Sequence, residues 1–108
     1  MTKLAHKHCS PGSQATALSS ADIETYLGDL NGWEKMGKEI QKTFGFKNYH
    51  ETMAFVNASA WVSHLEDHHP DLRVHFNKCV VAYSTHDAGG ITLNDFICAA
   101  KIDALLAD

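Results

Sequence analysis

The stretch Glu66-Asp67-His68-His69-Pro70-Asp71 separates two kinds of pattern in this 108-residue chain. Before it, apolar residues recur at the spacing of a helix, and after it apolar and polar residues alternate as in a strand. Proline disfavours helical geometry at the residue before it, so the helix should end at this point. The two adjacent histidines would then lie at a helix C-terminus, where the helix dipole favours a protonated imidazole.

The helix before this stretch is predicted to run from Asn48 to about Asp67. At about 100° per residue, its apolar side chains form one broad face that we expect to lie on the core. That face comprises Ala54, Phe55, Ala58, Trp61, Val62 and Leu65. The opposite side, which we expect to be solvated, carries Thr52, Ser59, Ser63 and Glu66.

The remaining elements follow from caps, turns and alternation. A first helix should begin at Ser19, with Asp22 as its capping-box partner, and stop at Asn31-Gly32. A hairpin should turn at Gly37-Lys38, and a second hairpin at Asn77-Lys78, with its last strand running to Thr85 and ended by His86. Thr92 is a good N-cap for a final helix.

This order predicts an α+β fold, α-β-β-α-β-β-α, in which the helices pack on one face of a four-stranded antiparallel sheet. Residues 1–18 lack periodicity and are expected to be a flexible N-terminal arm. Residues 19–108 are expected to form a single domain, because no repeat, long linker or second pattern is visible.

Composition excludes several classes of protein. The net charge is −4 and there is no basic run, which argues against a nucleic-acid partner. No apolar stretch approaches the ~20 residues of a membrane span, and the N-terminus lacks the apolar segment of a secretory signal. The three cysteines, Cys9, Cys79 and Cys98, are far apart and form no CxxC pair. We therefore expect reduced thiols and a soluble, cytoplasmic protein.

Histidines gather in the middle of the chain: five of the eight fall between residues 64 and 86. They are His64, His68, His69, His75 and His86. Imidazole changes charge near neutral pH and is also a common metal ligand. His64 and His68 share one helical face, as in zinc-binding helices, but the sequence between them departs from HExxH.

Acid–base chemistry uses more of the same residues. Two imidazoles on opposite sides of a small ligand can give and take protons, and Asp67 or Asp95 can orient them. Trp33 or Trp61 can stack on a flat heterocycle. Structural roles are also open, because the paired histidines can cap a helix, Asp95 can complete a capping box with Thr92, and Trp61 can belong to the core. Spacing alone leaves metal binding and proton transfer undecided.

Four motifs in this region resemble those of pterin-4a-carbinolamine dehydratases. They are Glu66-Asp67-His68-His69-Pro70, Asn77-Lys78, Ser84-Thr85-His86 and Asp95. The resemblance extends to Gly32-Trp33 and to the run from Phe44 to Tyr49, and covers roughly residues 19 to 106. It implies a lyase without cofactor or metal that removes water from 4a-hydroxytetrahydrobiopterin to give quinonoid dihydropterin. Such a reaction recycles the pterin of aromatic amino-acid hydroxylases.

The resemblance also implies roles for individual residues. The pterin-site histidines would be His68, His69 and His86, with substrate-binding positions at Asp67, Trp33 and Asp95. Many relatives carry a glutamate where this chain has His64, which leaves His64 as a further ligand-binding candidate. Our hypothesis is that His68 and His86 share the proton transfers, while His69 binds and orients the pterin.

Partners follow from the same resemblance. Family members form dimers or tetramers, so we expect a homodimer or homotetramer. Some animal members also act as dimerisation cofactors for a homeodomain transcription factor. A non-catalytic partner of a transcription regulator, or a histidine-rich metal-binding protein, is therefore the alternative function.

Overall fold

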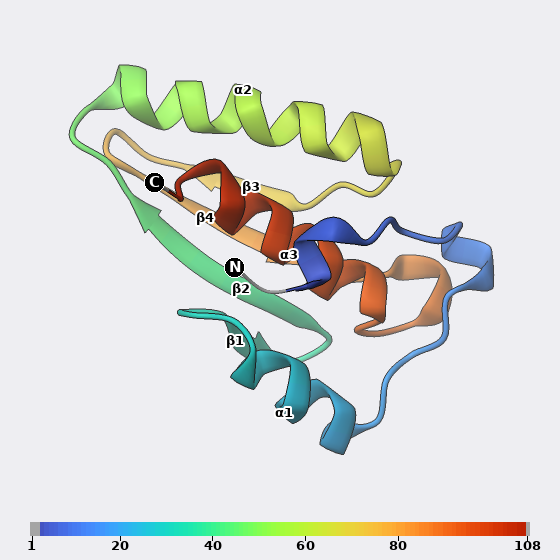
Figure 1. Cartoon of the computed structure of the whole chain (residues 1–108). Coiled ribbons are helices and arrows are strands. Elements are labelled where there is room, and N and C mark those ends of the chain that lie inside the picture. Colours follow the sequence, from blue (N-terminus) through green and yellow to red (C-terminus); the bar gives the residue numbers. More distant parts are fainter. Residues whose placement is uncertain (1–2, 108) are drawn as a thin grey trace.

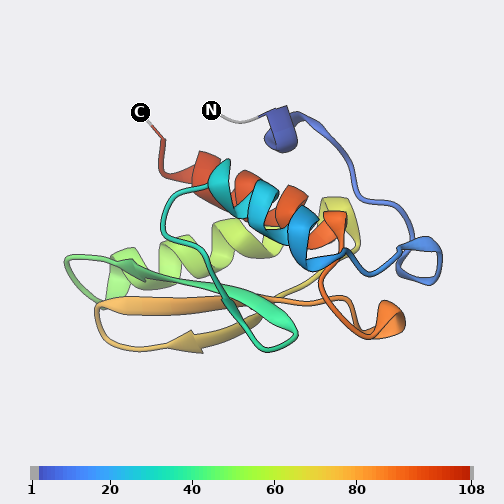
Figure 2. The same ribbon diagram turned by 90° about the horizontal axis from the view of Figure 1, so that it is seen from below.

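The computed structural model describes residues 3–107, in which a four-stranded antiparallel sheet carries three α-helices on one side (Figures 1 and 2). The strands lie in the order β1-β2-β4-β3. Their bounds are Glu34–Met36 for β1, Glu39–Gly45 for β2, Asp71–Val74 for β3 and Lys78–Tyr83 for β4. The helices are α1 (Ser20–Gly28), α2 (Tyr49–Glu66) and α3 (Leu93–Leu105). The predicted α-β-β-α-β-β-α fold is confirmed.

Short local signals place the ends of these elements. The Ser19 side chain accepts a hydrogen bond from Asp22 N–H at 3.2 Å and begins α1. The Asn48 side chain accepts from Glu51 N–H at 2.9 Å and begins α2, as predicted. Gly37, at φ 64°, makes the turn between β1 and β2. The helix α1 ends at Gly28, earlier than the Asn31-Gly32 stop that the sequence predicts.

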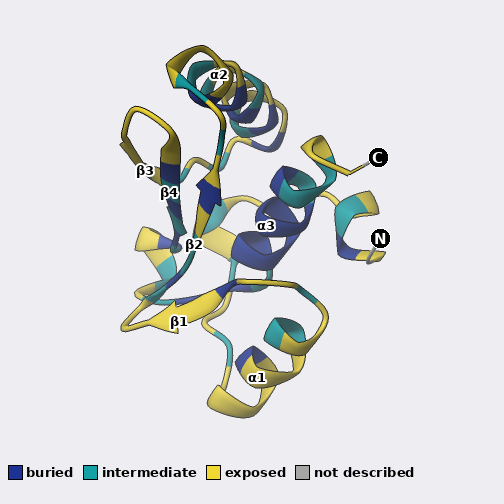
Figure 3. Cartoon of the chain, turned by 90° about the vertical axis from the view of Figure 1, so that its left-hand side faces the viewer, coloured by how far each residue is buried: buried dark blue, intermediate teal, exposed yellow. Residues whose placement is uncertain are grey.

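The core lies between the covered face of the sheet and α3, which is buried along most of its length (Figure 3). Ile40 of β2 pairs with Tyr83 of β4, and both are fully buried, as is Phe96 of α3. Each large apolar side chain buried in this way contributes about 1.5–3 kcal/mol. Because α3 is anchored over its first two turns, it can hold a side chain such as Asp95 in a fixed place.

The buried face of α2 differs from the predicted one. Its buried residues are Thr52, Phe55, Ser59, Val62 and Glu66, whereas Trp61 and Leu65 are each 62% exposed. The prediction that Trp61 lies in the core is therefore wrong. Polar side chains can lie inside because each has a partner: the Thr52 hydroxyl donates to carbonyls of Asn48 and Phe76, and the Ser59 hydroxyl donates to Val56 O.

The N-terminal segment packs on the domain. The sequence predicts residues 1–18 to be a flexible arm, but the described part, residues 3–18, runs along α3 and then past the turn after β4 (blue in Figure 1). Leu4 is buried, Lys101 of α3 donates to Ala5 O at 2.9 Å, and Leu18 N–H donates to Ile91 O. Residues 1 and 2 lie outside the described residues. A few isolated contacts of this kind leave no periodic signal in the sequence.

The end of β4 also differs from expectation. The strand stops at Tyr83, and a single bridge joins Thr85 to Gly90. His86 therefore belongs to a short 3-10 turn, η3 (His86–Ala88), which Gly89 closes at φ 72°. Within residues 3–107, no helix combines the length and the apolar character that crossing a membrane requires.

Candidate functional site

A pocket of about 300 Å³ opens at the C-terminal end of α2. It is lined by Gly12, Asp67, His68, His69, Ser84, Thr85, His86 and Asp87. The structure thus brings together His68 and His69, from the segment after α2, and His86, from η3. Asp67 lines the same pocket. His86 is 17 to 19 positions from the other three along the chain, and the hairpin of β3 and β4 returns the chain to this point.

A left-handed residue sets the directions of the two adjacent histidines. Asp67 has φ 50° and ends α2, with its N–H bonded to Ser63 O. His68 N–H also donates to Ser63 O, at 3.3 Å, so the chain reverses tightly before Pro70. The side chain of His68 is then only 12% exposed, whereas His69 is exposed. One imidazole is therefore held by the protein, and the other is free to meet a ligand.

The ring of His68 is fixed by a buried carboxylate. Its Nε2 lies 2.6 Å from Oδ1 of Asp95, which is fully buried in the first turn of α3. The other oxygen of Asp95 accepts from Thr92 N–H at 2.8 Å and from the Thr85 hydroxyl at 3.0 Å. Because Asp95 acts as the acceptor for these donors, Nε2 of His68 donates to it. Nδ1 is then the nitrogen of His68 that can exchange a proton with a ligand.

Tyr83 forms the floor beneath His68. The two rings stack with centroids 5.8 Å apart and planes inclined by 12°. Tyr83 is fully buried, and among residues 3–107 its hydroxyl has no hydrogen-bond partner. Burial, together with nearby Cys98, Cys9 and Asp95, raises the pKa of Tyr83 above its ordinary value. The phenol therefore stays neutral at physiological pH and supports the imidazole without adding a charge.

Three predicted ligand-binding residues do not line this pocket: Asp95, which is buried and contacts His68 instead, His64 and Trp33. His64 is exposed on α2 with its ring against Trp61, at a centroid distance of 5.2 Å. The i, i+4 alignment of His64 with His68 is lost because the left-handed Asp67 takes His68 off the helical face. Trp33 is only 5% exposed and lies behind Tyr83, where its Nε1 donates to Asp103 at 3.0 Å. Among the described residues, no three His, Cys, Asp or Glu side chains are grouped to hold a metal ion.

The N-terminal segment contributes a wall that the sequence did not predict. Gly12 lines the pocket, and a Cβ atom at this position would lie 3.1 Å from Oδ2 of Asp87. A side chain here would therefore press on the turn that carries His86. The dipeptide Pro11-Gly12 was the available signal, but such a pair marks turns in general and does not indicate which surface the turn meets.

Glu66, the first residue of the histidine motif, anchors this segment from behind the pocket. Its Oε1 accepts from Cys9 N–H at 2.7 Å, and its Oε2 lies 2.9 Å from His8 Nδ1 and 3.8 Å from Lys101 Nζ. Burial by itself would raise the pKa of Glu66. The hydrogen bonds from Cys9 and His8, together with Lys101, outweigh burial and hold the pKa below its ordinary value of 4.5.

We expect Glu66→Gln to lower the free energy of unfolding at pH 7 by about 1–3 kcal/mol, because charge-assisted hydrogen bonds are lost. A carboxyl whose folded-state pKa is lowered stabilises the fold above its unfolded pKa, and this stabilisation is lost as pH falls through the folded value. The difference between variant and wild type should therefore shrink below about pH 4. Urea unfolding at pH 7 and pH 3 measures it, with exposed Glu24→Gln of α1 as control. A difference that does not change with pH would contradict the assignment.

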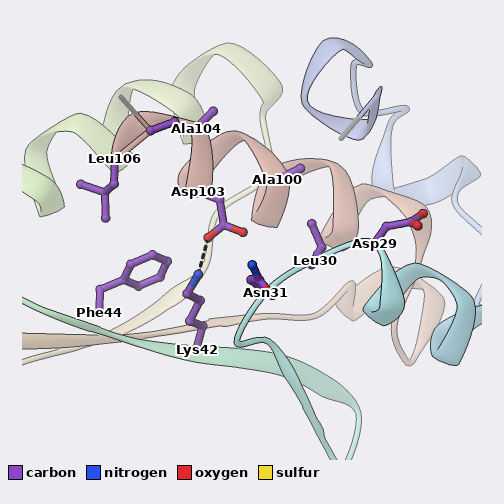
Figure 4. Close-up of a pocket in the computed structure, with 10 residues that line it drawn as sticks. Asp29, Leu30, Asn31, Lys42, Phe44, Ala100, Asp103, Ala104 and Leu106 are labelled. Carbon is purple, nitrogen blue, oxygen red and sulfur yellow. Dashed lines mark hydrogen bonds and ion pairs between the residues drawn. The ribbon is translucent and has the colours of Figure 1, made fainter. Parts of the chain in front are cut away.

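A second and larger pocket, of about 420 Å³, lies near the C-terminal end of α3 and is shown in Figure 4. Two of its three charged groups satisfy one another: Lys42 of β2 pairs with Asp103 of α3 at 2.9 Å, and Trp33 donates to the same carboxylate, whereas the third, Asp29, makes no ion pair within residues 3–107. Lys42 also lies over the ring of Phe44. This larger pocket contains no histidine, so the smaller pocket remains the candidate active site.

Comparison with known proteins bears on this site directly. Residues 16–105 match the family model described as Pterin 4 alpha carbinolamine dehydratase. A protein of Chromobacterium violaceum named "Putative pterin-4-alpha-carbinolamine dehydratase" is 57% identical over 97 residues, which cover 90% of this chain and 90% of that protein. A protein of the same name from Nitrosospira multiformis is 57% identical over 103 residues, 94% of this chain and 91% of that protein.

Two solved structures share the fold. The crystal structure of a transcriptional coactivator/pterin dehydratase from Brucella melitensis matches with a TM-score of 0.82 and 28% identity, over 85% of this chain and all of that one (100%). A pterin dehydratase-like protein identified as a RuBisCO assembly factor in the alpha-carboxysome matches with a TM-score of 0.62 and 26% identity, over 72% and 93%. Those names include both an enzyme and protein-binding factors, so the fold alone does not separate the two roles.

Proposed function

Because the chain belongs to the pterin-4a-carbinolamine dehydratase family, we propose that it removes water from 4a-hydroxytetrahydropterin to give quinonoid dihydropterin. The observation that carries this proposal is the convergence of His68, His69 and His86 on one pocket, with His68 fixed by a buried carboxylate. A volume of about 300 Å³ suits a bicyclic ring held partly in the open. The product would return to an aromatic amino-acid hydroxylase in the cytoplasm.

The reaction needs one proton given and one taken. The C4a–O bond breaks, an acid protonates the departing hydroxide to form water, and a ring N–H loses its proton to a base. His68 suits the base, because the Asp95 carboxylate on Nε2 stabilises the imidazolium that forms when Nδ1 takes a proton. His86, which comes from η3, gives the proton to the leaving oxygen. The acid and the base then exchange protons with water and are restored.

His69 and Asp67 would hold the substrate. Both are exposed and line the pocket beside His68, so they can reach polar atoms of the pterin. Neither has a side-chain hydrogen bond within residues 3–107, which leaves both free to bind a ligand. In this scheme Asp95 contacts His68 and does not contact the substrate.

We expect wild-type protein to accelerate the decay of the 4a-hydroxytetrahydropterin absorbance in a stopped-flow assay. His69→Ala should lower kcat/KM by about 10–100-fold, mainly through KM, because a binding interaction of a few kcal/mol is lost. His75→Ala, an exposed histidine outside the pocket, serves as the matched control. A wild-type chain that leaves the decay rate unchanged would indicate a non-catalytic binding protein and overturn the proposal.

Self-association is the second part of the proposal. Trp61 and Leu65 are large apolar side chains exposed on α2, and a second copy of the chain would cover them in a homodimer or homotetramer. Light scattering gives the molar mass in solution, and a value for one chain of 11.9 kDa would count against such an assembly.

A further inference from the structure

Two cysteine sulfurs meet where the N-terminal segment crosses α3. Sγ of Cys9 and Sγ of Cys98 are 3.5 Å apart, and Cys9 Sγ also lies 3.6 Å from Asn94 O. Cys98 is fully buried, whereas Cys9 is only partly buried. The third thiol, Cys79, is buried in β4. The proposed reaction at the histidine pocket uses none of the three.

We propose that Cys9 and Cys98 form a reversible disulfide, so that this thiol pair is a site of oxidative modification. A disulfide requires a sulfur–sulfur distance of about 2.05 Å, so the two sulfurs need to approach by about 1.5 Å. Cys98 is held within α3, but residues 7–11 around Cys9 belong to no helix or strand. The movement can therefore come from the Cys9 side without disturbing the core.

The two thiols have different parts in this chemistry. Cys9 is the one that an oxidant such as hydrogen peroxide can reach. The hydrogen bond between the two thiols raises the pKa of Cys98, and burial raises it further. Cys98 therefore remains a protonated thiol. The sulfur of Cys9 attacks peroxide, the O–O bond breaks, and a sulfenic acid and water form. The sulfur of Cys98 then attacks that of Cys9 and gives its proton to the departing hydroxide, the S–O bond breaks, and a second water leaves. Two thiols and one peroxide thus give one disulfide and two waters.

The disulfide would fix one wall of the candidate active site. Hydrogen bonds already hold its neighbours: Cys9 N–H donates to Glu66, and Ser10 exchanges two hydrogen bonds with Asn94 of α3. Gly12, three residues after Cys9, lines the histidine pocket. In the reduced chain this segment can open locally, because only non-covalent contacts retain it. In the oxidised chain the segment cannot leave α3. A thiol reductant breaks the disulfide and lets the segment open locally again.

The test is a count of thiols on the full chain. After treatment of the folded protein with hydrogen peroxide and then denaturation, titratable thiols should fall from three to one, with the loss of two hydrogen atoms by mass spectrometry. Peptide mapping should join Cys9 to Cys98. Cys79→Ser, the matched control, should form the same bridge and keep none of its two thiols free. Cys9→Ser should keep both of its thiols, and dithiothreitol should restore all three in wild type.

Two further measurements report the linkage itself. Trypsin should cut after Lys7 more slowly in oxidised than in reduced wild type, and equally in both states of Cys9→Ser. The melting temperature should rise by about 10 °C on oxidation, because the bridge closes a long loop. Three thiols that persist after oxidation of a folded chain, a bridge that contains Cys79, or a bridge only between two chains would each overturn the proposal. None of these measurements depends on dehydratase activity.

Discussion

The His86→Ala variant should dehydrate 4a-hydroxytetrahydropterin about 10²–10⁴-fold more slowly than wild type, because a positioned acid or base contributes about that factor. His86 lies in η3 at the mouth of the pocket and is exposed. No hydrogen bond to its ring occurs within residues 3–107, so its removal should change the free energy of unfolding by no more than about 0.5 kcal/mol. The effect should therefore appear in kcat, with the circular dichroism spectrum and melting temperature unchanged.

Two additional measurements distinguish proton transfer from substrate binding at His86. Free imidazole added to His86→Ala should restore part of the rate, because it can supply the missing proton donor. The pH dependence of kcat should also lose one of its limbs in the variant. His75→Ala should match wild type in both assays. A near-normal kcat for His86→Ala would show that His86 does not carry the proton transfer, and a near-normal kcat/KM for His69→Ala would show that His69 does not bind the pterin.

The fold could be predicted from the sequence because its signals are local. Ser19, Asn48 and Thr92 each mark a helix start within one residue, and Pro70 limits the end of α2. The burial of α2 could not be predicted in the same way. Its inner face includes Ser59 and Glu66, whose partners are a carbonyl one turn back and a chain segment 57 residues away. A hydrophobicity pattern cannot register such partners, so it favoured the side that carries Trp61.

The candidate site could also be predicted only in part from the sequence. His68, His69 and His86 could be selected from spacing and resemblance, because the hairpin between them has a predictable length. The surroundings of these three histidines could not be predicted in this way. Whether His64 stays beside His68 depends on one left-handed residue, Asp67, and aspartate is only somewhat favoured in that conformation. Tyr83 looks like any core residue of a strand, although in the structure its ring supports the imidazole of His68.

Asp95→Ala should have the largest effect on stability, a loss of about 3–5 kcal/mol in the free energy of unfolding. Its carboxylate is fully buried and accepts three hydrogen bonds, from Thr92 N–H, the Thr85 hydroxyl and His68 Nε2. Loss of the cap costs about 1 kcal/mol. The Thr92 N–H would then be buried without a partner, at about 1–3 kcal/mol, and His68 Nε2 would lose its charged partner, whereas the Thr85 hydroxyl can still donate to Thr92 Oγ1 at 2.7 Å. Urea unfolding measures the total, and Asp22→Ala on α1, an exposed first-turn carboxylate, is the control.

Asp95→Asn separates the structural role of this residue from its effect on His68. The amide oxygen can still accept from Thr92 and Thr85, so most of the stability should remain. The amide NH₂ then faces His68 Nε2, which has to become an acceptor, and the ring proton moves to Nδ1. With a proton already on Nδ1, His68 cannot accept one from the pterin, and kcat should fall about 10²–10⁴-fold. If Asp95→Asn keeps the wild-type rate while Asp95→Ala is destabilised, Asp95 only caps α3, and His68 takes no proton through Nδ1.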